Sequence, residues 1–411
     1  MYKRIPGTKD ILPEEVISWQ RAESTARKVF ALYNYQEMRT PIIENVSLFN
    51  RTLGETTEIV QKQMFLIHNQ EDTYALRPEG TASVVRSYLE NNLAKISGLA
   101  KLYYIGPMFR LERPQKGRLR QFHHIGAEVI GSSLATLDIE VISLASQLLL
   151  EFGISGYQLK INSLGCPKDK QALSLALKKS LSDKLSALCP VCQTRAKHNV
   201  LRILDCKNPD CQNIIKTLEL KHAHLCPDCL GHFEEVKSGL NNLGIAFSVV
   251  PQLVRGLDYY NRTVFEITHN SLGSQDALGA GGRYNNLVQE LGGPELGAIG
   301  FAFGVERLLL TPHSLKQPSL NKLVYLIALG EAAKSAGIKI LNQLRSAGIS
   351  ADTDYSNRSL KGAMRAANDA KAAFVLILGE DELKANTISI KDMAAGTQKQ
   401  IAIQNLIQEL K

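Results

Sequence analysis

The chain has 411 residues, a length that predicts two or three domains, each able to bury its own core. Its composition, 44% apolar and 21% charged residues, is typical of globular proteins and excludes a disordered or low-complexity chain. The net charge of +8 favours polyanionic partners without requiring them. Because no apolar run is long enough for a membrane span or a signal peptide, we expect a cytoplasmic protein without membrane contact.

The first part of the chain alternates between a long helix and short strands. Apolar residues recur every three or four positions over residues 13–33, which predicts an amphipathic helix. Pro41 follows in a strand-like segment, where its missing N–H favours an edge or an interface. Residues 73–77, 102–109 and 121–131 are rich in β-formers, so we expect an α+β domain built on an antiparallel sheet with flanking helices.

An insertion and a second domain follow. Residues 170–245 are predicted to form a small inserted domain, cysteine-rich over 189–229. The sheet then resumes with a strand over 255–268, a Gly-rich turn at 279–282 and a helix over 303–310. A linker with Pro312 and Pro318 ends the first domain at about residue 320, and residues 322–411 alternate strand and helix like a separate α/β domain.

One predicted loop between two strands carries five cations, Arg110, Arg113, Lys116, Arg118 and Arg120. Such cations repel one another, so the loop favours visits by polyanions, although a merely solvated loop explains it equally well. Arginine suits phosphate because its planar guanidinium binds two oxygens and keeps its charge. Arg307 follows the Gly-rich residues 297–300, where backbone can approach a ligand closely, but this signal is weak alone.

Acids and tyrosines in apolar surroundings form a second group of candidates: Glu79, Glu128, Tyr259 and Tyr260. A carboxylate and a phenol together can bind the nitrogens of a heteroaromatic ring, or hold an ammonium group. Taken singly, each is explained more simply by a structural role. The chain has no Ser/His/Asp spacing and no P-loop, so neither chemistry is indicated.

Six of the seven cysteines lie in the insertion. Cys189-Pro-Val-Cys192 and Cys226-Pro-Asp-Cys229 are paired CxxC motifs, which in a reducing compartment favour tetrahedral zinc. The simplest structural zinc site is Cys189, Cys192, Cys226 and Cys229, with Cys206 and Cys211 as competing ligands. A set of reduced thiols without metal is the alternative, and the isolated Cys166 is expected to be a buried thiol.

Together these stretches resemble the bacterial histidyl-tRNA synthetases, a family of class II aminoacyl-tRNA synthetases, over nearly the whole chain. Pro41 is similar to the dimer-interface proline of class II motif 1, residues 104–131 to motif 2 and residues 297–307 to motif 3. Leu253-Val-Arg-Gly-Leu-Asp-Tyr-Tyr260 and Ala280-Gly-Gly-Arg-Tyr284 resemble signatures of the histidine enzymes and their close relatives. The resemblance implies a class II catalytic domain, an anticodon-binding domain from about Lys322, and a homodimer.

The resemblance also implies a reaction. L-Histidine and ATP, with Mg²⁺ on its β- and γ-phosphates, would give histidyl-adenylate and pyrophosphate, and histidine would then pass to the 3′ end of tRNA(His). Arg110 and Arg255 would be the catalytic cations on the α-phosphate. ATP would be bound by Arg110, Glu112, Arg118 and Arg307. Histidine would be bound by Glu79, Thr81, His124, Glu128, Arg255, Tyr259 and Tyr260.

Some of the implied details depart from the family or stay open. His124 replaces an expected glutamine, so its charge is expected to titrate near neutral pH. Asn285 replaces an expected aspartate but keeps an acceptor oxygen. The insertion is expected to close over the acceptor stem and the loop of residues 113–120 to touch its first base pair. Three cations along one predicted helical stretch could face tRNA phosphates or only solvent, Lys361, Arg365 and Lys371.

Two other functions compete with this one. A catalytically inactive, histidine-binding regulatory paralogue of histidine biosynthesis would share the core, but it would typically lack the C-terminal module and alter the histidine signatures. A general nucleic-acid-binding protein would use the basic loop, but it would not need the acids and tyrosines.

Overall fold

The computed structural model describes residues 2–54, 57–96, 98–218, 220, 222–312 and 322–410. Two units, Met1–Leu315 and Lys316–Lys411, each have their own contacts and core. Most of the predicted linker, including Pro318 and the boundary at residue 320, lies outside the described residues. None of the helices in the described ranges combines the length and apolar character needed to cross a membrane.

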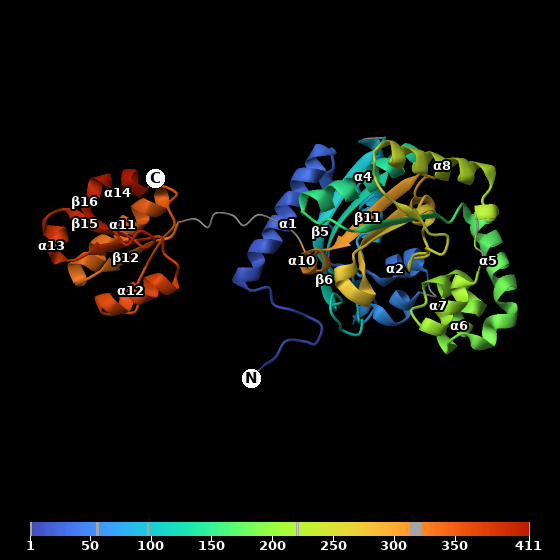
Figure 1. The fold of residues 1–411 in the computed structure, drawn as a ribbon, viewed down its shortest axis with the longest axis horizontal. Coiled ribbons are helices and arrows are strands. Elements are labelled where there is room, and N and C mark those ends of the chain that lie inside the picture. Colours follow the sequence, from blue (N-terminus) through green and yellow to red (C-terminus); the bar gives the residue numbers. More distant parts are fainter. Residues whose placement is uncertain are drawn as a thin grey trace. The chain divides into compact units, whose positions relative to one another are not determined.

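A sheet of eight strands forms the centre of the first unit (Figure 1), in the order β1-β5-β6-β11-β10-β9-β7-β8. Its strands are antiparallel apart from the pairs β1–β5 and β7–β8 at its two edges. The bounds are β1 Gln36–Glu37, β5 Ala100–Phe109, β6 Gln121–Ile130, β7 Gln158–Ser163, β8 Ser248–Val249, β9 Asn261–Thr268, β10 Ala277–Arg283 and β11 Ala298–Gly304. The predicted antiparallel sheet with flanking helices is confirmed.

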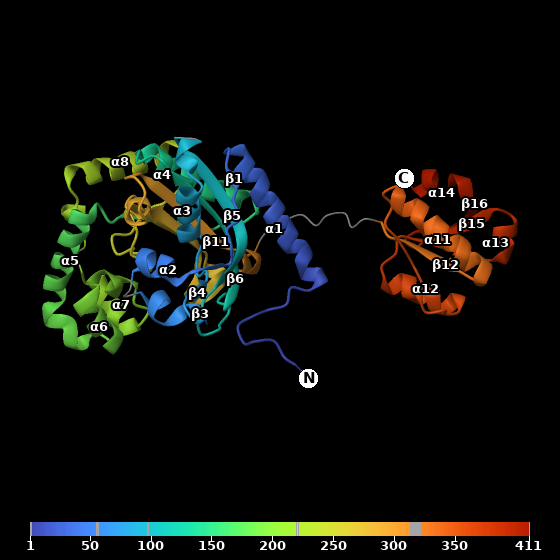
Figure 2. The same ribbon diagram turned by 180° about the vertical axis from the view of Figure 1, so that it is seen from behind.

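The two faces of this sheet carry different partners. One face packs its apolar side chains against the helices α1 (Pro13–Leu32), α4 (Ala135–Glu151) and α8 (Pro227–Asn242). The other face (Figure 2) carries α2 (Val46–Leu53), α3 (Thr81–Glu90), α9 (Leu287–Glu290) and a small sheet of β2 (Ile43–Asn45), β3 (Phe65–His68) and β4 (Thr73–Leu76). Side chains alternate along a strand, so β6 presents Ile125, Ala127 and Val129 to the first face and His124 and Glu128 to the second.

Helices make up the insertion between β7 and β8. They are α5 (Pro167–Leu181), η3 (Ser182–Ala187), α6 (Pro190–His198), η4 (Val200–Asp205), α7 (Pro209–Lys216), η5 (His222–His224) and α8. The last of these returns to the main body, because Phe233, Val236 and Leu240 of α8 are buried in the same core as α4.

Two details of the predicted elements are wrong. The predicted strand over residues 255–268 begins only at Asn261, because residues 253–260 form a loop. The predicted Gly-rich turn at residues 279–282 lies inside β10, between β9 and β11. A Cβ atom on Gly281 would lie 2.3 Å from the carbonyl oxygen of Gly300. The glycine therefore allows close packing of neighbouring strands, whereas the composition alone suggested a turn.

The second unit has a five-stranded sheet in the order β13-β12-β14-β15-β16. Its strands are β12 Val324–Ala328, β13 Ala351–Thr353, β14 Phe374–Leu378, β15 Thr387–Asp392 and β16 Gln398–Ala402, and its helices are α11 Glu331–Ser346, α12 Leu360–Asp369, α13 Glu380–Lys384 and α14 Leu406–Leu410. The predicted strand and helix alternation is confirmed. Lys361 and Arg365 share α12, but Lys371 lies beyond the helix end in a left-handed conformation (φ 55°), so placing it on that helix was wrong.

A fully buried ion pair fastens the end of β10 to α4. The Arg283 guanidinium lies 2.6 Å from the Asp138 carboxylate, and neither side chain is exposed to solvent. Arg283 also donates to the carbonyl oxygens of Ser132 and Leu134 and to Oδ1 of Asn285. Asn285 thus supplies the acceptor that was expected of it. The arginine of the Gly-Gly-Arg-Tyr stretch is therefore structural.

Replacing Asp138 by Ala is expected to cost about 3–5 kcal/mol in the free energy of unfolding, because it leaves Arg283 as a buried, unpaired charge. Urea denaturation measures this. The control is Glu90→Ala, which breaks an exposed pair with Arg86 and should cost less than about 1 kcal/mol. Equal losses in the two variants would contradict the role given to the buried pair.

Candidate active site

A cavity of about 310 Å³ opens on the second face of the large sheet. Its walls come from β6, β9, β10, β11, the loop after β5 and the loop of residues 253–260. Ten residues proposed from the sequence line it: Glu79, Thr81, Arg110, Glu112, Arg118, His124, Arg255, Tyr259, Tyr260 and Arg307. The structure thus brings together positions that are up to 228 residues apart, Glu79 and Arg307.

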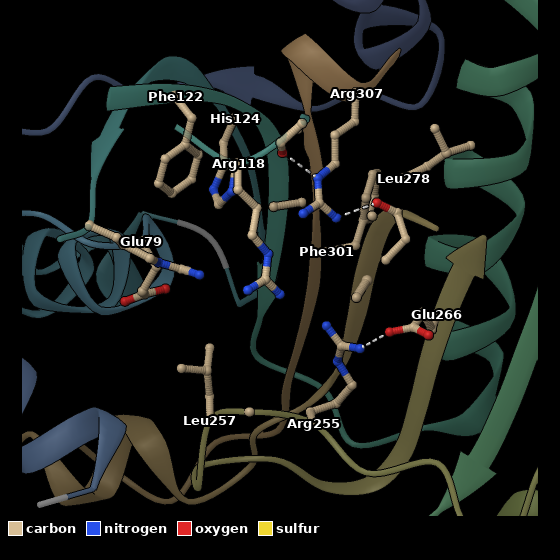
Figure 3. A pocket seen from close by; sticks show the side chains of 18 of the residues that line it. Glu79, Arg118, Phe122, His124, Arg255, Leu257, Glu266, Leu278, Phe301 and Arg307 are labelled. Atoms are coloured by element: carbon tan, nitrogen blue, oxygen red, sulfur yellow. Dashed lines mark hydrogen bonds and ion pairs between the residues drawn. The ribbon is translucent and has the colours of Figure 1, made fainter. Parts of the chain in front are cut away.

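Three arginines crowd one end of the cavity, and each has a fixed partner. Arg307 donates to the carbonyl oxygens of Gly117 (2.9 Å) and Ala277 (2.6 Å) (Figure 3). Arg110 donates to the carbonyl oxygen of Pro78 at 2.9 Å, and Arg118 pairs with Glu112 at 3.3 Å. Burial, with the charges of Arg118 and Arg110, lowers the pKa of Arg307. The arginines therefore repel one another, and a polyanion would relieve that repulsion.

A fourth arginine, Arg255, enters the cavity from another wall (Figure 3). It forms an ion pair with Glu266 of β9, while its Nε is buried and has no hydrogen-bond partner. Burial alone would lower the pKa of Arg255, but the Glu266 carboxylate outweighs it and raises the pKa. The guanidinium is thus charged, held in one orientation and still able to donate a further hydrogen bond to a ligand.

Lys170 and Arg202 hold the loop that carries Arg255. The Lys170 ammonium of α5 donates to the carbonyl oxygens of Asp258 (3.0 Å) and Tyr260 (2.9 Å). Arg202 of η4 donates to the Gly256 carbonyl oxygen at 2.8 Å and pairs with the Asp258 carboxylate at 3.0 Å. Both donors belong to the insertion or its boundary, so the insertion sets the position of this loop.

Carboxyl groups occupy the other end of the site. Glu79 is buried and accepts hydrogen bonds from the backbone N–H groups of Thr81 (2.7 Å) and Ala82 (2.9 Å), at the start of α3. Burial raises the pKa of Glu79 despite these donors. Its carboxylate is oriented by the helix start while its side chain lines the cavity.

The Glu128 side chain lies behind the cavity wall and is not among the described residues that line the cavity. One of its oxygens accepts from Thr81 Oγ1 (2.6 Å) and Tyr104 (3.3 Å), and the other from Tyr284 (2.5 Å). Burial raises the pKa of Glu128 to about 8. Space for this carboxyl depends on Gly300 of β11, where a Cβ atom would lie 1.7 Å from Glu128 Oε2.

Two tyrosines complete this polar end. Tyr259 and Tyr260 are buried, with ring centroids 4.6 Å apart, and both line the cavity. Burial raises the pKa of Tyr260 to about 12. Both phenols are therefore neutral at physiological pH and can donate or accept a hydrogen bond.

The expectation that His124 titrates near neutral pH is wrong. Burial, with the positive charges of Arg110 and Arg307, lowers its pKa to about 3. Its Nδ1 atom is buried without a partner and its side chain lines the cavity. His124 is thus a neutral imidazole with one nitrogen left for a ligand.

The four cysteines proposed from the sequence as one zinc site do not lie together in the structure. Cys189 and Cys192 cluster with Cys206 and Cys211, whereas Cys226 and Cys229 cluster with Cys166 and Asp169. The description of Cys166 as an isolated buried thiol is also wrong, because it is half-buried within this second cluster. Short CxxC loops keep their two cysteines together, but which loops meet depends on how the helices pack.

Sequence reasoning missed several residues at the site. Glu266 holds Arg255, Tyr104 and Tyr284 hold Glu128, and Asp205 and Lys207 of the insertion line the cavity. Tyr104 and Tyr284 belong to stretches that had been singled out, so their signal was present. Glu266, Asp205 and Lys207 sit in an ordinary alternating strand or a charged loop, where nothing in the local pattern distinguishes them.

Comparisons with known proteins agree over the whole chain. The family model described as Histidyl-tRNA synthetase matches residues 7–308, and that described as Anticodon binding domain matches residues 323–411. Curated histidine–tRNA ligases of Halothermothrix orenii and Moorella thermoacetica are 45% and 46% identical, over 98% and 97% of this chain and 97% and 95% of theirs. The crystal structure of apo histidyl-tRNA synthetase from S. aureus matches with a TM-score of 0.82 and 34% identity, covering all of both chains. This chain belongs to the histidyl-tRNA synthetase family.

Proposed function

We propose that the cavity catalyses both steps of the histidine–tRNA ligase reaction. The observation that carries this is four arginines facing a carboxyl- and hydroxyl-rich end within one cavity, a match for ATP phosphates beside an amino acid. The regulatory-paralogue alternative is less supported, because the curated relatives match through the C-terminal domain that such paralogues typically lack.

We further propose that the chain acts in the cytoplasm, where its tRNA substrate is.

In the first step, a carboxylate oxygen of histidine attacks the α-phosphorus of ATP, and the bond to pyrophosphate breaks. Negative charge grows on the α-phosphate oxygens as this happens. Arg110 and Arg255, entering from different walls, stabilise that charge, and their fixed partners remove the need for reorganisation during the reaction. Arg118 and Arg307 would bind the departing phosphates, and Glu112, which pairs with Arg118 in the free chain, would contact adenine.

Mg²⁺ is expected to enter with ATP and to neutralise its β- and γ-phosphates. The lining also includes the carboxylate of Asp276, an oxygen donor of the type that Mg²⁺ prefers, whereas Glu112 and Glu266 pair with Arg118 and Arg255. Asp276 therefore fits the role of a single protein ligand to a magnesium–ATP complex that is held mainly by its phosphates.

Histidine occupies the polar end in this proposal. Glu79 and Thr81 bind its ammonium group, and neutral His124 donates to its carboxylate through a ring N–H. Tyr259 and Tyr260 contact the imidazole, and Glu128 binds an imidazole N–H once one of its hydroxyl partners has turned away. An amino acid without these ring nitrogens would leave buried polar groups unpaired, which accounts for specificity.

In the second step, a hydroxyl of the 3′-terminal ribose of tRNA(His) attacks the carbonyl carbon of the adenylate and AMP leaves. Arg113 and Lys116 are exposed at the tip of the loop beside the cavity and are proposed to contact the acceptor stem. The insertion is proposed to close over that stem. The C-terminal domain, with Lys361 and Arg365 on α12, is proposed to bind the anticodon.

The proposed function predicts exchange of labelled pyrophosphate into ATP with histidine alone among the twenty amino acids, without tRNA. Arg255→Ala should lower that exchange about 100- to 1,000-fold, mainly in kcat, because one preorganised donor to the transition state is lost. Arg113→Ala is the matched control and should change exchange little, because its side chain is exposed and outside the described lining.

Near-normal exchange by Arg255→Ala would overturn the role of Arg255. Histidine binding without exchange in the unaltered chain would overturn the ligase function and favour the regulatory paralogue.

Glu128→Gln is expected to stabilise the free protein increasingly as pH rises. The pKa of this carboxyl rises from its usual 4.5 to about 8 on folding. Its contribution to the free energy of unfolding is therefore fully present below pH 4.5 and is lost as pH rises toward 8. A glutamine amide carries no such penalty. Melting temperatures from pH 5 to 8 should show a growing gap between the variant and the parent, and histidine-dependent exchange should fall.

The control for this prediction is His124→Gln. Folding lowers the pKa of His124 from its usual 6.5 to about 3, so the unfolded chain binds a proton below pH 6.5 that the folded chain does not, and the parent gains stability as pH rises from 5 to 6.5. His124→Gln lacks this gain, so its melting temperature should fall relative to the parent over that range, the opposite of the trend expected for Glu128→Gln. A constant gap for Glu128→Gln would contradict the raised pKa of Glu128.

We also propose that the chain forms a homodimer through the region around Pro41. Apolar side chains on the small sheet are unusually open to solvent there: Ile42 41%, Ile43 50%, Leu66 45% and Ile67 40%. Arg77, which is buried, donates to the carbonyl oxygens of Thr40 and Pro107, at 2.9 Å in both cases, and so links this region to the end of β5.

Sedimentation equilibrium at micromolar concentration should therefore give a dimer. Ile43→Asp should give a monomer, because it places a charge in the apolar contact. A monomeric parent chain would contradict the proposed dimer.

A further inference from the structure

Two clusters of potential metal ligands lie in and beside the insertion, apart from the residues assigned to catalysis. The first consists of Cys189, Cys192, Cys206 and Cys211, and the second of Cys166, Asp169, Cys226 and Cys229. Within each cluster, the ligand atoms all lie within 4.8 Å of one another. We propose that each cluster binds one structural zinc ion, so that the chain carries two.

The distances fit this geometry. Zinc–sulfur bonds of about 2.3 Å in a tetrahedron place two sulfur atoms about 3.8 Å apart. The Sγ atoms of Cys189 and Cys206 are 3.9 Å apart. Each cluster has four ligands and no position left for a substrate, which is the pattern of structural rather than catalytic zinc.

A repeated local structure identifies Asp169 as a ligand. Cys166-Pro-Lys-Asp169, Cys189-Pro-Val-Cys192 and Cys226-Pro-Asp-Cys229 each begin a helix, with the first cysteine at the N-cap and proline next. Asp169 thus occupies in α5 the position that a second cysteine occupies in α6 and α8. The partial positive charge of a helix start favours the anionic ligand atoms that zinc requires.

Backbone donors around the clusters complete the pattern. The N–H of Cys189 donates to Cys211 Sγ at 3.2 Å, and that of Asn208 donates to Cys206 Sγ at 3.4 Å. In the second cluster the N–H groups of Cys166 and Cys226 donate to the two oxygens of Asp169, at 3.2 and 3.1 Å. Such donors orient metal ligands and stabilise their charge.

Each cluster holds a part of the cavity wall. In the first, Cys206 lies between Asp205 and Lys207, which line the cavity, and the cluster joins the starts of α6 and α7 to the end of η4. In the second, Asp169 precedes Lys170, whose ammonium holds the carbonyl oxygens of Asp258 and Tyr260. Zinc binding at these clusters would therefore fix the insertion and the loop of residues 253–260.

Elemental analysis of the full chain, purified without chelators or metal-affinity steps, is the first test. We expect two zinc ions per chain. Cys192→Ser and Asp169→Asn should each leave one, while Asp169→Cys should retain two. The matched control is Asp228→Asn, which removes a carboxylate from a cluster loop but one that pairs with Arg262 outside the cluster, so two zinc ions should remain.

A second test uses the unaltered protein, so its result does not depend on whether the variants fold. Its cobalt-substituted form should show thiolate-to-cobalt absorption, and chelation should lower its melting temperature. Only trace zinc, with all the thiols of the folded chain reacting with a disulfide reagent, would overturn both sites. One zinc ion that survives Asp169→Asn and disappears in Cys192→Ser would overturn the second site.

Discussion

Four guanidinium groups gathered in one cavity are the constraint on which the rest of the site depends. Arg110, Arg118, Arg255 and Arg307 would repel one another in a flexible setting, so each needs a fixed partner and a rigid support. Backbone carbonyl oxygens and the carboxylates of Glu112 and Glu266 provide the partners. The arginines themselves lie on the loop after β5, on the loop before β9 and on α10 (Val305–Leu310), all of which adjoin strands of the large sheet. In the proposed function, the positive charge is thus in place before ATP binds, as electrostatic catalysis requires.

The polar end shows the opposite arrangement. Here the protein buries carboxyls rather than cations, and hydroxyl groups surround them. Glu128 is largely protonated near neutral pH in the free chain, because its pKa is about 8, so this carboxyl adds little negative charge opposite the arginines. A substrate with ring nitrogens can exchange hydrogen bonds with these groups at small electrostatic cost. In the proposed function, the polar end would recognise the amino acid while the cationic end would stabilise the charge that develops on phosphate.

The loop of residues 253–260 joins the two ends, because it carries Arg255 at one side and Tyr259 and Tyr260 at the other. It has no regular structure, so its conformation depends on contacts from outside. Lys170 and Arg202 supply those contacts, and both lie close in sequence to the proposed zinc ligands. The helical insertion, which buries Leu177, Leu181 and Ile203 in its core, thereby positions the loop that carries Arg255, and the two proposed zinc ions would add to its stability.

Local chemistry in the sequence determined the elements and the residue types of the site. The apolar periodicity of residues 13–33, the alternation along residues 121–131, the arginines and the CxxC loops were all readable, since each depends on neighbours a few positions away. Only the tertiary structure decided that Gly281 sits inside a strand, that Glu266 holds Arg255, that His124 stays neutral, and which cysteine loops share a cluster. These depend on packing between segments far apart in the chain, where distance, burial and neighbouring charge are set by the fold as a whole.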